Sequence, residues 1–153
     1  MLIYFAAPLF SQAERKFNQH LTQKIEARGF SVFLPQRDGI EMIKPPYDQM
    51  SADELRLVIF QKDRDNILNA DIFLFVLDGR VPDEGACVEL GIAYSQKYLL
   101  NKEKLLIGLL TDDRSAFQWT QLNSMIHGAL DIITDNASDL LSALESYRQA
   151  KVK

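Results

Sequence analysis

Three carboxylates are candidates for catalysis because of where they fall in the predicted helices. The clearest is Glu89, which is the one charged residue in the run Gly85–Tyr94 (GACVELGIAY). Burying an ionised carboxylate is costly unless the group is paired or hydrogen-bonded, so proteins seldom keep one without a use. A Glu on the exposed edge of the helix is the alternative, but the small residues around Glu89 leave room for a ligand. We therefore predict that Glu89 is a functional carboxylate.

A second carboxylate, Asp63, falls on an apolar stripe of a predicted helix. The stripe has the four-residue spacing of one helix face and runs through Leu55, Ile59, Asp63 and Ile67. This spacing directs Asp63 towards the interior. The charged residues on either side of Asp63 are typical of a solvated face, and a small rotation of the helix would place it among them. The sequence leaves both orientations open.

The third carboxylate, Asp83, follows Pro82 and is predicted first as the N-cap of the helix that carries Glu89. It also falls at the carboxyl end of a strand–turn–helix unit, where α/β proteins bind ligands, so it could serve both purposes. Tyr4, in the first predicted strand, would be an ordinary core tyrosine on its own. Beside a buried carboxylate, its hydroxyl could orient that carboxylate and hold it ionised.

Motifs for other chemistries are missing from the chain. No GxGxxG follows the first strand, where the sequence reads Ala6-Ala7-Pro8, and there is no GxxxxGK[ST] phosphate loop. With one cysteine and two histidines far apart, no metal-ligand set of recognisable spacing is present. A Ser-His-Asp triad is not excluded by chain order, although no GxSxG elbow occurs. We predict no metal and no cofactor.

The elements that must position these residues alternate along the chain, as in a parallel sheet covered by helices. The predicted strands are residues 2–7, 31–35, 71–78, 104–110 and 130–133. The predicted helices are residues 11–28, 51–69 and 83–97, a segment around 119–128, and a closing helix that begins at Asn136 or Ser138. The first of them has Ser11 as a plausible N-cap, Glu14 three positions later, and Gly29 as its stop.

The stretch Gln36–Met50 has no clear period and is predicted as a loop, which at that length is more often functional than idle. Right-handed crossovers between the strands give a doubly wound α/β fold with a five-stranded parallel sheet and helices on both faces. In such a fold we expect ligands at the carboxyl ends of the strands.

Length and charge narrow the classes of function. A chain of 153 residues fits one domain, 1–153, and the net charge of −4 comes with no cluster of basic residues. Neither nucleic acid nor an anionic membrane surface is therefore expected as the main partner. The apolar start lacks the basic region of a signal peptide, and no apolar run is long enough to span a bilayer. The lone Cys87 favours a reducing, cytoplasmic location.

Four segments together resemble the nucleoside 2-deoxyribosyltransferases. They are YFAAPLF at 4–10, FQKDRDNILNAD at 60–71, PDEGACVELGIA at 82–93 and LNSM at 122–125. The D-x-G-x-x-x-E-L-G-x-A core is fairly specific, and the resemblance covers most of the chain in order. Ala7 replaces a glycine of the family pattern. This difference is expected to narrow the bottom of the substrate pocket, and it removes no catalytic group.

The resemblance implies a flavodoxin-like fold and a double displacement at the anomeric carbon of deoxyribonucleosides, with free nucleobases as leaving and entering groups. In that scheme Glu89 matches the nucleophile, Tyr4 its orienting tyrosine and Asp83 the residue that handles protons on the base. Asp63 matches the carboxylate that contacts sugar or base. The implied substrate-binding set is Asn123, Met125, Ala6, Phe10 and Gly85. Asn123 matches a residue that contacts the sugar of the substrate bound in a neighbouring subunit. The resemblance therefore implies a homo-oligomer with active sites completed across subunits.

Two other functions compete with this interpretation. The first is a deoxynucleoside 5′-monophosphate N-glycosidase, a hydrolase relative in which serines tend to match Asp83 and Asn123 and bind the phosphate. A carboxylate at position 83 would repel a 5′-phosphate, which favours the transferase. The second is a non-catalytic nucleotide-binding sensor, which would have no reason to bury the carboxylate of Glu89.

Overall fold

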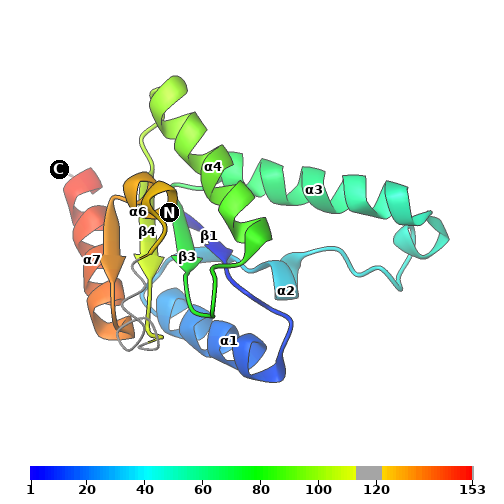
Figure 1. Cartoon of the computed structure of the whole chain (residues 1–153), viewed down its shortest axis with the longest axis horizontal. Coiled ribbons are helices and arrows are strands. Elements are labelled where there is room, and N and C mark those ends of the chain that lie inside the picture. The colour runs from blue at the N-terminus through cyan, green and yellow to red at the C-terminus, as the bar shows by residue number, and fades with distance from the viewer. Residues whose placement is uncertain (113–121, 153) are drawn as a thin grey trace.

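Five parallel strands form one sheet in the residues described by the structure, a computed structural model that covers 1–112 and 122–152 (Figure 1). In chain order the strands are β1 (Leu2–Ala6), β2 (Ser31–Phe33), β3 (Ile72–Val76), β4 (Leu105–Leu109) and β5 (Ile132–Thr134). Their order across the sheet is β2-β1-β3-β4-β5, and every neighbouring pair is parallel. This is the flavodoxin-like, doubly wound order, and its switch point lies between β1 and β3. The predicted fold class is confirmed.

Helices cover both faces of this sheet. On one face lie α1 (Gln12–Glu26) and α7 (Ala137–Val152), and on the other lie α3 (Ala52–Asn69), α4 (Glu84–Leu99) and the short α6 (Ser124–Ala129) (Figure 1). The N-terminus of α1 carries the predicted capping box between Ser11 and Glu14. Within the described ranges, no helix combines the length and apolar character needed to cross a membrane.

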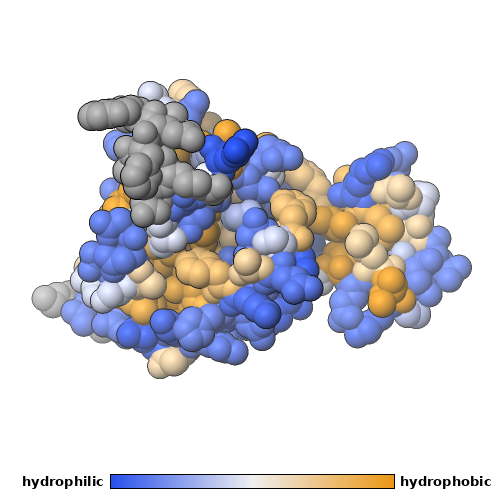
Figure 2. All heavy atoms as spheres, turned by 60° about the horizontal axis from the view of Figure 1, so that its bottom comes forward, coloured by the Kyte–Doolittle hydropathy of each residue, from blue (hydrophilic) through white to orange (hydrophobic). Residues whose placement is uncertain are grey.

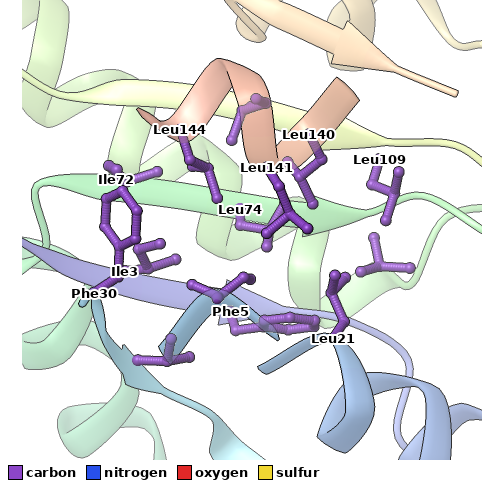
Figure 3. Close-up of a cluster of buried hydrophobic side chains, with 14 of the residues drawn as sticks. Ile3, Phe5, Leu21, Phe30, Ile72, Leu74, Leu109, Leu140, Leu141 and Leu144 are labelled. Carbon is purple, nitrogen blue, oxygen red and sulfur yellow. The ribbon is translucent and has the colours of Figure 1, made fainter. Parts of the chain in front are cut away.

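The core has two halves because successive residues of a strand point to opposite faces. Ile3 and Phe5 of β1 pack with Leu21 of α1 and Leu144 of α7 on one face, as Figure 3 shows (Figure 3). The next residues along β1, Tyr4 and Ala6, face α3 and α4 instead. The alternation of a buried strand thus delivers the Tyr4 side chain to the face where both helices carry carboxylates.

The segment 31–50 departs from its prediction. The second strand ends at Phe33, and Pro35 begins the short helix α2 (Pro35–Asp38) instead of closing the strand. The fixed backbone angle of proline suits the first turn of a helix, which explains this difference. The predicted loop 36–50 also contains a 3-10 turn, η1 (Tyr47–Gln49).

The predicted helix around 119–128 corresponds to α6, which begins only at Ser124. Asn123 is the N-cap of α6, and its side chain accepts from the Met125 amide. Residues 119–121 of the predicted segment lie outside the described residues. The last strand covers residues 132–134 and not the predicted 130–133, because Leu130 still serves as the C-cap of α6.

Candidate active site

A hydrogen bond between Tyr4 and Glu89 is the centre of the candidate site. The Tyr4 hydroxyl donates to Glu89 Oε1 at 2.7 Å. Tyr4 has no exposed surface, and its ring stacks between Phe33 and Phe73 at centroid distances of 5.6 and 5.7 Å. Rings held on both sides leave the hydroxyl one direction to point in. The carboxylate of Glu89 is therefore oriented by a rigid donor.

Small residues of α4 surround Glu89. Ala86 and Ala93, one turn before and one turn after it, are both buried against the sheet, and Glu89 itself is half-buried. Residues three and four positions apart share a helix face, so Glu89 stands between two methyl groups. Alanine on both sides places no large side chain next to the carboxylate on this face of α4.

Burial raises the pKa of three groups in this cluster, Glu89, Asp63 and Tyr4. Burial raises the pKa of Glu89 to about 7, the hydrogen bond from Tyr4 lowers that pKa, and the charges of Asp63 and Asp83 raise it. Burial also raises the pKa of Asp63 to about 6, against a lowering effect of Lys62. The pKa of Tyr4 is raised far above its ordinary range by burial and by the same carboxylates, so Tyr4 stays a donor. Glu89 can thus exchange its proton near neutral pH.

The two other carboxylates lie on different elements and act on Glu89 through their charge. Asp63 lies half-buried on α3, and its charge acts on both Tyr4 and Glu89, so of its two predicted orientations the structure has the inward one. Asp83 is the N-cap of α4, where its Oδ2 accepts from the Ala86 amide at 2.9 Å. A side chain at Gly85 would place its Cβ 3.2 Å from the same Oδ2. Glycine at position 85 therefore keeps the Asp83 carboxylate uncrowded.

The predicted binding residues are spread more widely. Ala6 is buried in the same half of the core as Tyr4, whereas Phe10 is 75% exposed beyond the carboxyl end of β1. Met125 is 82% exposed on α6. In the described part of the chain, no hydrogen bond joins Asn123 to Tyr4 or Glu89. The structure therefore brings together Tyr4 and the three carboxylates, whereas Met125 lies with Cys87 and Leu90 in a groove between α4 and α6.

Two residues of α1 that the sequence analysis did not select hold the loop after β1. Asn18 is buried, and its Nδ2 donates to the Pro8 carbonyl at 2.9 Å and to Gln36 Oε1 at 3.0 Å. Arg15 Nη1 donates to the carbonyls of residues 9 and 10 at 2.9 and 3.0 Å. Three successive carbonyls of residues 8–10 are thus fixed by α1. The signal for Asn18 is its place on the buried face of α1, shared with Leu21, Thr22 and Ile25.

This arrangement can perform acid–base and nucleophilic chemistry with carboxylates alone. Glu89 offers an oriented oxygen, and the charge of Asp83 raises the pKa of Glu89. A pair of this kind can attack a carbon centre and move a proton on the departing group. Among the described residues, no group of three or more His, Cys, Asp or Glu is placed to hold a metal ion.

Comparison with known proteins identifies the family of the chain. A family model described as nucleoside 2-deoxyribosyltransferase matches residues 3–141. No curated protein matches the chain by sequence. Similar solved structures include a conserved protein from Enterococcus faecalis V583, 24% identical over 96% of this chain and 98% of that chain, with a TM-score of 0.76.

The 2-deoxyribosyltransferase from Bacillus psychrosaccharolyticus is 22% identical over 92% of this chain and 90% of that chain, with a TM-score of 0.69. A CMP N-glycosidase from Clostridium botulinum is 20% identical over 96% of this chain and 99% of that chain, with a TM-score of 0.56. At these identities the three solved structures share the fold. The family model covers most of the sequence, and the chain belongs to the nucleoside 2-deoxyribosyltransferase family.

Proposed function

We propose that the protein transfers the 2-deoxyribosyl group between nucleobases by a retaining double displacement through a covalent deoxyribosyl–Glu89 intermediate. The observation that carries the proposal is the Glu89 carboxylate, oriented by the Tyr4 hydroxyl at 2.7 Å and flanked by alanines. Breaking an N-glycosidic bond builds positive charge on the sugar, and an ionised carboxylate beside that carbon stabilises the transition state. The reaction needs no cofactor.

The first displacement forms a bond between a Glu89 oxygen and the anomeric carbon while the N-glycosidic bond breaks. The electron pair of that bond leaves with the base, and the Asp83 carboxyl group supplies the proton that the base takes up. Tyr4 holds Oε1 of Glu89, so Oε2 is the attacking atom. Asp63, on the facing helix, contacts the sugar or the base.

The second displacement reverses these steps with another base. A nitrogen of the incoming base attacks the anomeric carbon, Asp83 takes its proton, and the Glu89 ester bond breaks to free the carboxylate. Two inversions return the starting configuration. Substrates are 2′-deoxyribonucleosides, because a 2′-hydroxyl withdraws electrons from the charged carbon and must also fit beside Glu89. Ala6, Phe10 and Gly85 line the substrate position in this proposal.

A second candidate function is hydrolysis of a deoxynucleoside 5′-monophosphate. It is supported by the fold shared with the CMP N-glycosidase. The negative charge of Asp83, at the N-terminus of α4, works against a phosphate at that position. We therefore place transfer ahead of hydrolysis.

One incubation separates the candidates. The protein is mixed with deoxyinosine and free adenine, and deoxyadenosine is measured by chromatography. Formation of deoxyadenosine with little free deoxyribose supports transfer. Release of base from a deoxynucleoside 5′-monophosphate, with no deoxyadenosine in the first mixture, would support the hydrolase. Binding of nucleosides without either product would support the sensor. When adenosine and deoxyadenosine are compared as substrates, adenosine should react poorly, and equal rates would contradict the proposal.

We also propose that the enzyme is a homo-oligomer in which Asn123 and Met125 complete a neighbour's site. Asn123, the N-cap of α6, makes no hydrogen bond to its own chain's Tyr4 or Glu89 among the described residues, and Met125 on α6 is largely exposed. A neighbouring subunit offers a place where these side chains would meet a substrate.

A further inference from the structure

The rotation of α3 about its own axis decides whether Asp63 faces Glu89, and the front of the helix does not fix that rotation. The first half of α3 projects beyond the sheet and forms a lobe set apart from the body (Figure 1; Figure 2). Leu57 and Phe60, on its turns, are 55% and 47% exposed. Ile67, close to the other end, is the one buried residue of the helix. The contacts that orient Asp63 are therefore expected near the carboxyl end of α3.

Two side chains from elsewhere in the fold bind backbone carbonyls at that end. The last carbonyls of a helix lack partners within the helix and need donors from outside it. Gln96 Nε2 donates to the Leu68 carbonyl at 2.7 Å, and Lys104 Nζ donates to the Ile67 carbonyl. Both donor residues are buried. Burial lowers the pKa of Lys104 to about 8, against an opposing effect of Asp71. At neutral pH Lys104 is therefore charged, and a cation is favourable at the carboxyl end of a helix.

Gln96 links the two helices that carry the carboxylates. It lies seven positions after Glu89, and this spacing places both residues on one side of α4. Its acceptor, Leu68, lies five positions after Asp63 on α3. Gln96 Oε1 is also buried, and it has no hydrogen-bond partner in the part of the chain that the structure describes. An unpaired buried acceptor is destabilising, so the use of this amide lies in its donor, which joins α4 to α3.

We propose that Gln96 and Lys104 are positioning residues of the candidate site, which hold the carboxyl end of α3 and so keep Asp63 turned towards Glu89. One donor comes from α4 and the other from the residue before β4, so the helix end is bound from two elements. Rotation of α3 would break these hydrogen bonds. The effect on catalysis rests on the proposed function, whereas the orientation of Asp63 can be measured without any reaction.

The pKa of Glu89 reports that orientation. The ionisable groups that act on Glu89 are Tyr4 of β1, Asp63 of α3 and Asp83 at the start of α4, and the charge of Asp63 raises the pKa. NMR titration of the side-chain carboxyl carbons measures this pKa, and Glu89→Gln assigns the signal. Wild type should give about 7. Asp63→Asn removes the charge and gives the full decrease that the loss of Asp63 can cause.

Gln96→Met removes the donor and nearly keeps the length of the side chain. The pKa of Glu89 should fall by most of the decrease seen in Asp63→Asn, and Lys104→Met should act in the same direction. In the Asp63→Asn background, Gln96→Met should lower the pKa no further, because the charge through which it acts is already gone. Gln61→Met makes the same substitution at an exposed position of α3 and should leave the pKa at its wild-type value.

The kinetic result should follow the same pattern. Above pH 8, where Glu89 is mostly ionised in every variant, kcat/KM for the deoxynucleoside should fall roughly fivefold in Gln96→Met. The double variant Gln96→Met/Asp63→Asn should be no worse than Asp63→Asn alone. A lowered pKa of Glu89 in a protein without transfer activity would support the positioning role and reject the proposed function.

Three results would overturn the positioning role. The first is an unchanged pKa of Glu89 in both Gln96→Met and Lys104→Met. The second is a decrease in Gln96→Met that persists in full in the Asp63→Asn background, since Gln96 would then act on Glu89 by another route. The third is loss of the native circular dichroism spectrum in both variants, which would show that the two side chains only hold the fold together.

Discussion

The chemistry of single side chains in this protein turns on how Glu89 is held near its ionisation point. Burial and two neighbouring carboxylates raise its pKa, and the Tyr4 hydroxyl opposes them. In the proposed reaction Glu89 must be ionised to attack the sugar, and its protonated form is inert. The balance between these effects therefore decides the pH range in which the proposed reaction runs.

Tyr4→Phe should move that range upward. The ring still stacks between Phe33 and Phe73, but the hydrogen bond that lowers the pKa of Glu89 is lost. In wild type, kcat/KM should rise with pH through about 7, where Glu89 ionises. In the variant the rise should come at higher pH, with a loss of roughly tenfold below pH 7 and a smaller loss above pH 8. A loss of the same size at every pH would refute this role of Tyr4.

Glu89→Gln should abolish transfer and make the fold more stable in alkaline buffer. A carboxyl group whose pKa rises from 4.5 to about 7 on folding stabilises the native state while it is protonated. That contribution is complete below pH 4.5 and is lost as the pH rises through about 7. At pH 8 the neutral glutamine should therefore add about 1–3 kcal/mol to the free energy of unfolding.

Urea unfolding at pH 8 and at pH 5 measures this difference, which should shrink at the lower pH. Transfer should fall more than about a thousandfold, because the attacking oxygen is gone. Near-normal turnover, or an equal change in stability at both pH values, would count against Glu89 as a buried nucleophile.

Asp83→Asn should separate proton transfer from binding. Asparagine still caps α4, so the backbone around Ala86 stays in place. It cannot exchange a proton with the base, and kcat should fall by about 10²–10⁴ with a much smaller change in KM. Steady-state kinetics with deoxyinosine and adenine provide the measurement. A large rise in KM with kcat unchanged would reassign Asp83 to substrate binding.

Among the secondary-structure elements, α1 has a role beyond covering the sheet. Its side chains hold three successive carbonyls of the loop after β1, and Asn18 ties that loop to Gln36 of α2. The loop leaves the carboxyl end of β1 at the switch point, where ligands of this fold bind. We expect α1 to fix the position of this loop, against which the substrate would bind.

Arg15→Met tests this arrangement at an exposed position. It removes the two hydrogen bonds to the loop carbonyls, each worth about 1 kcal/mol, and leaves the α1 backbone intact. KM for the deoxynucleoside should rise roughly three- to tenfold while kcat changes little. Lys16→Met is the matched control, since it removes the same charge from the next residue of α1. Equal effects of the two variants would show that charge matters here and the loop contacts do not.

We expect Asn123 to act in the assembled homo-oligomer. Its side chain caps α6 in its own chain, which keeps the amide beside the exposed Met125. If Asn123 serves a neighbour's site, Glu89→Ala and Asn123→Ala chains should each be nearly inactive and should regain activity when mixed. Hybrid interfaces rebuild some wild-type sites, up to about a quarter of them. Asn123→Ser keeps a capping side chain and controls for damage to α6.

Subunit exchange must be shown with tagged chains in the same mixture. If exchange occurs and activity stays absent, Asn123 acts within its own chain.

Much of the fold was predictable because it rests on local patterns. The alternation of buried strands with helices, the capping box at Ser11 and the helix start at Asp83 all follow from neighbouring residues. Glu89 stood out for the same reason, since a lone charge in an apolar helix is anomalous without any partner being known. The short α2 was missed because Pro35 fits both the end of a strand and the start of a helix.

Other features depend on contacts between residues far apart in the chain. Tyr4 and Glu89 are separated by 85 positions, and their pairing required β1 and α4 to lie on the same face of the sheet. The orientation of Asp63 was open until the packing of α3 set the rotation of that helix. Periodicity gives the faces of an element, but the rotation and crossing angle of each element come from how it packs against the others.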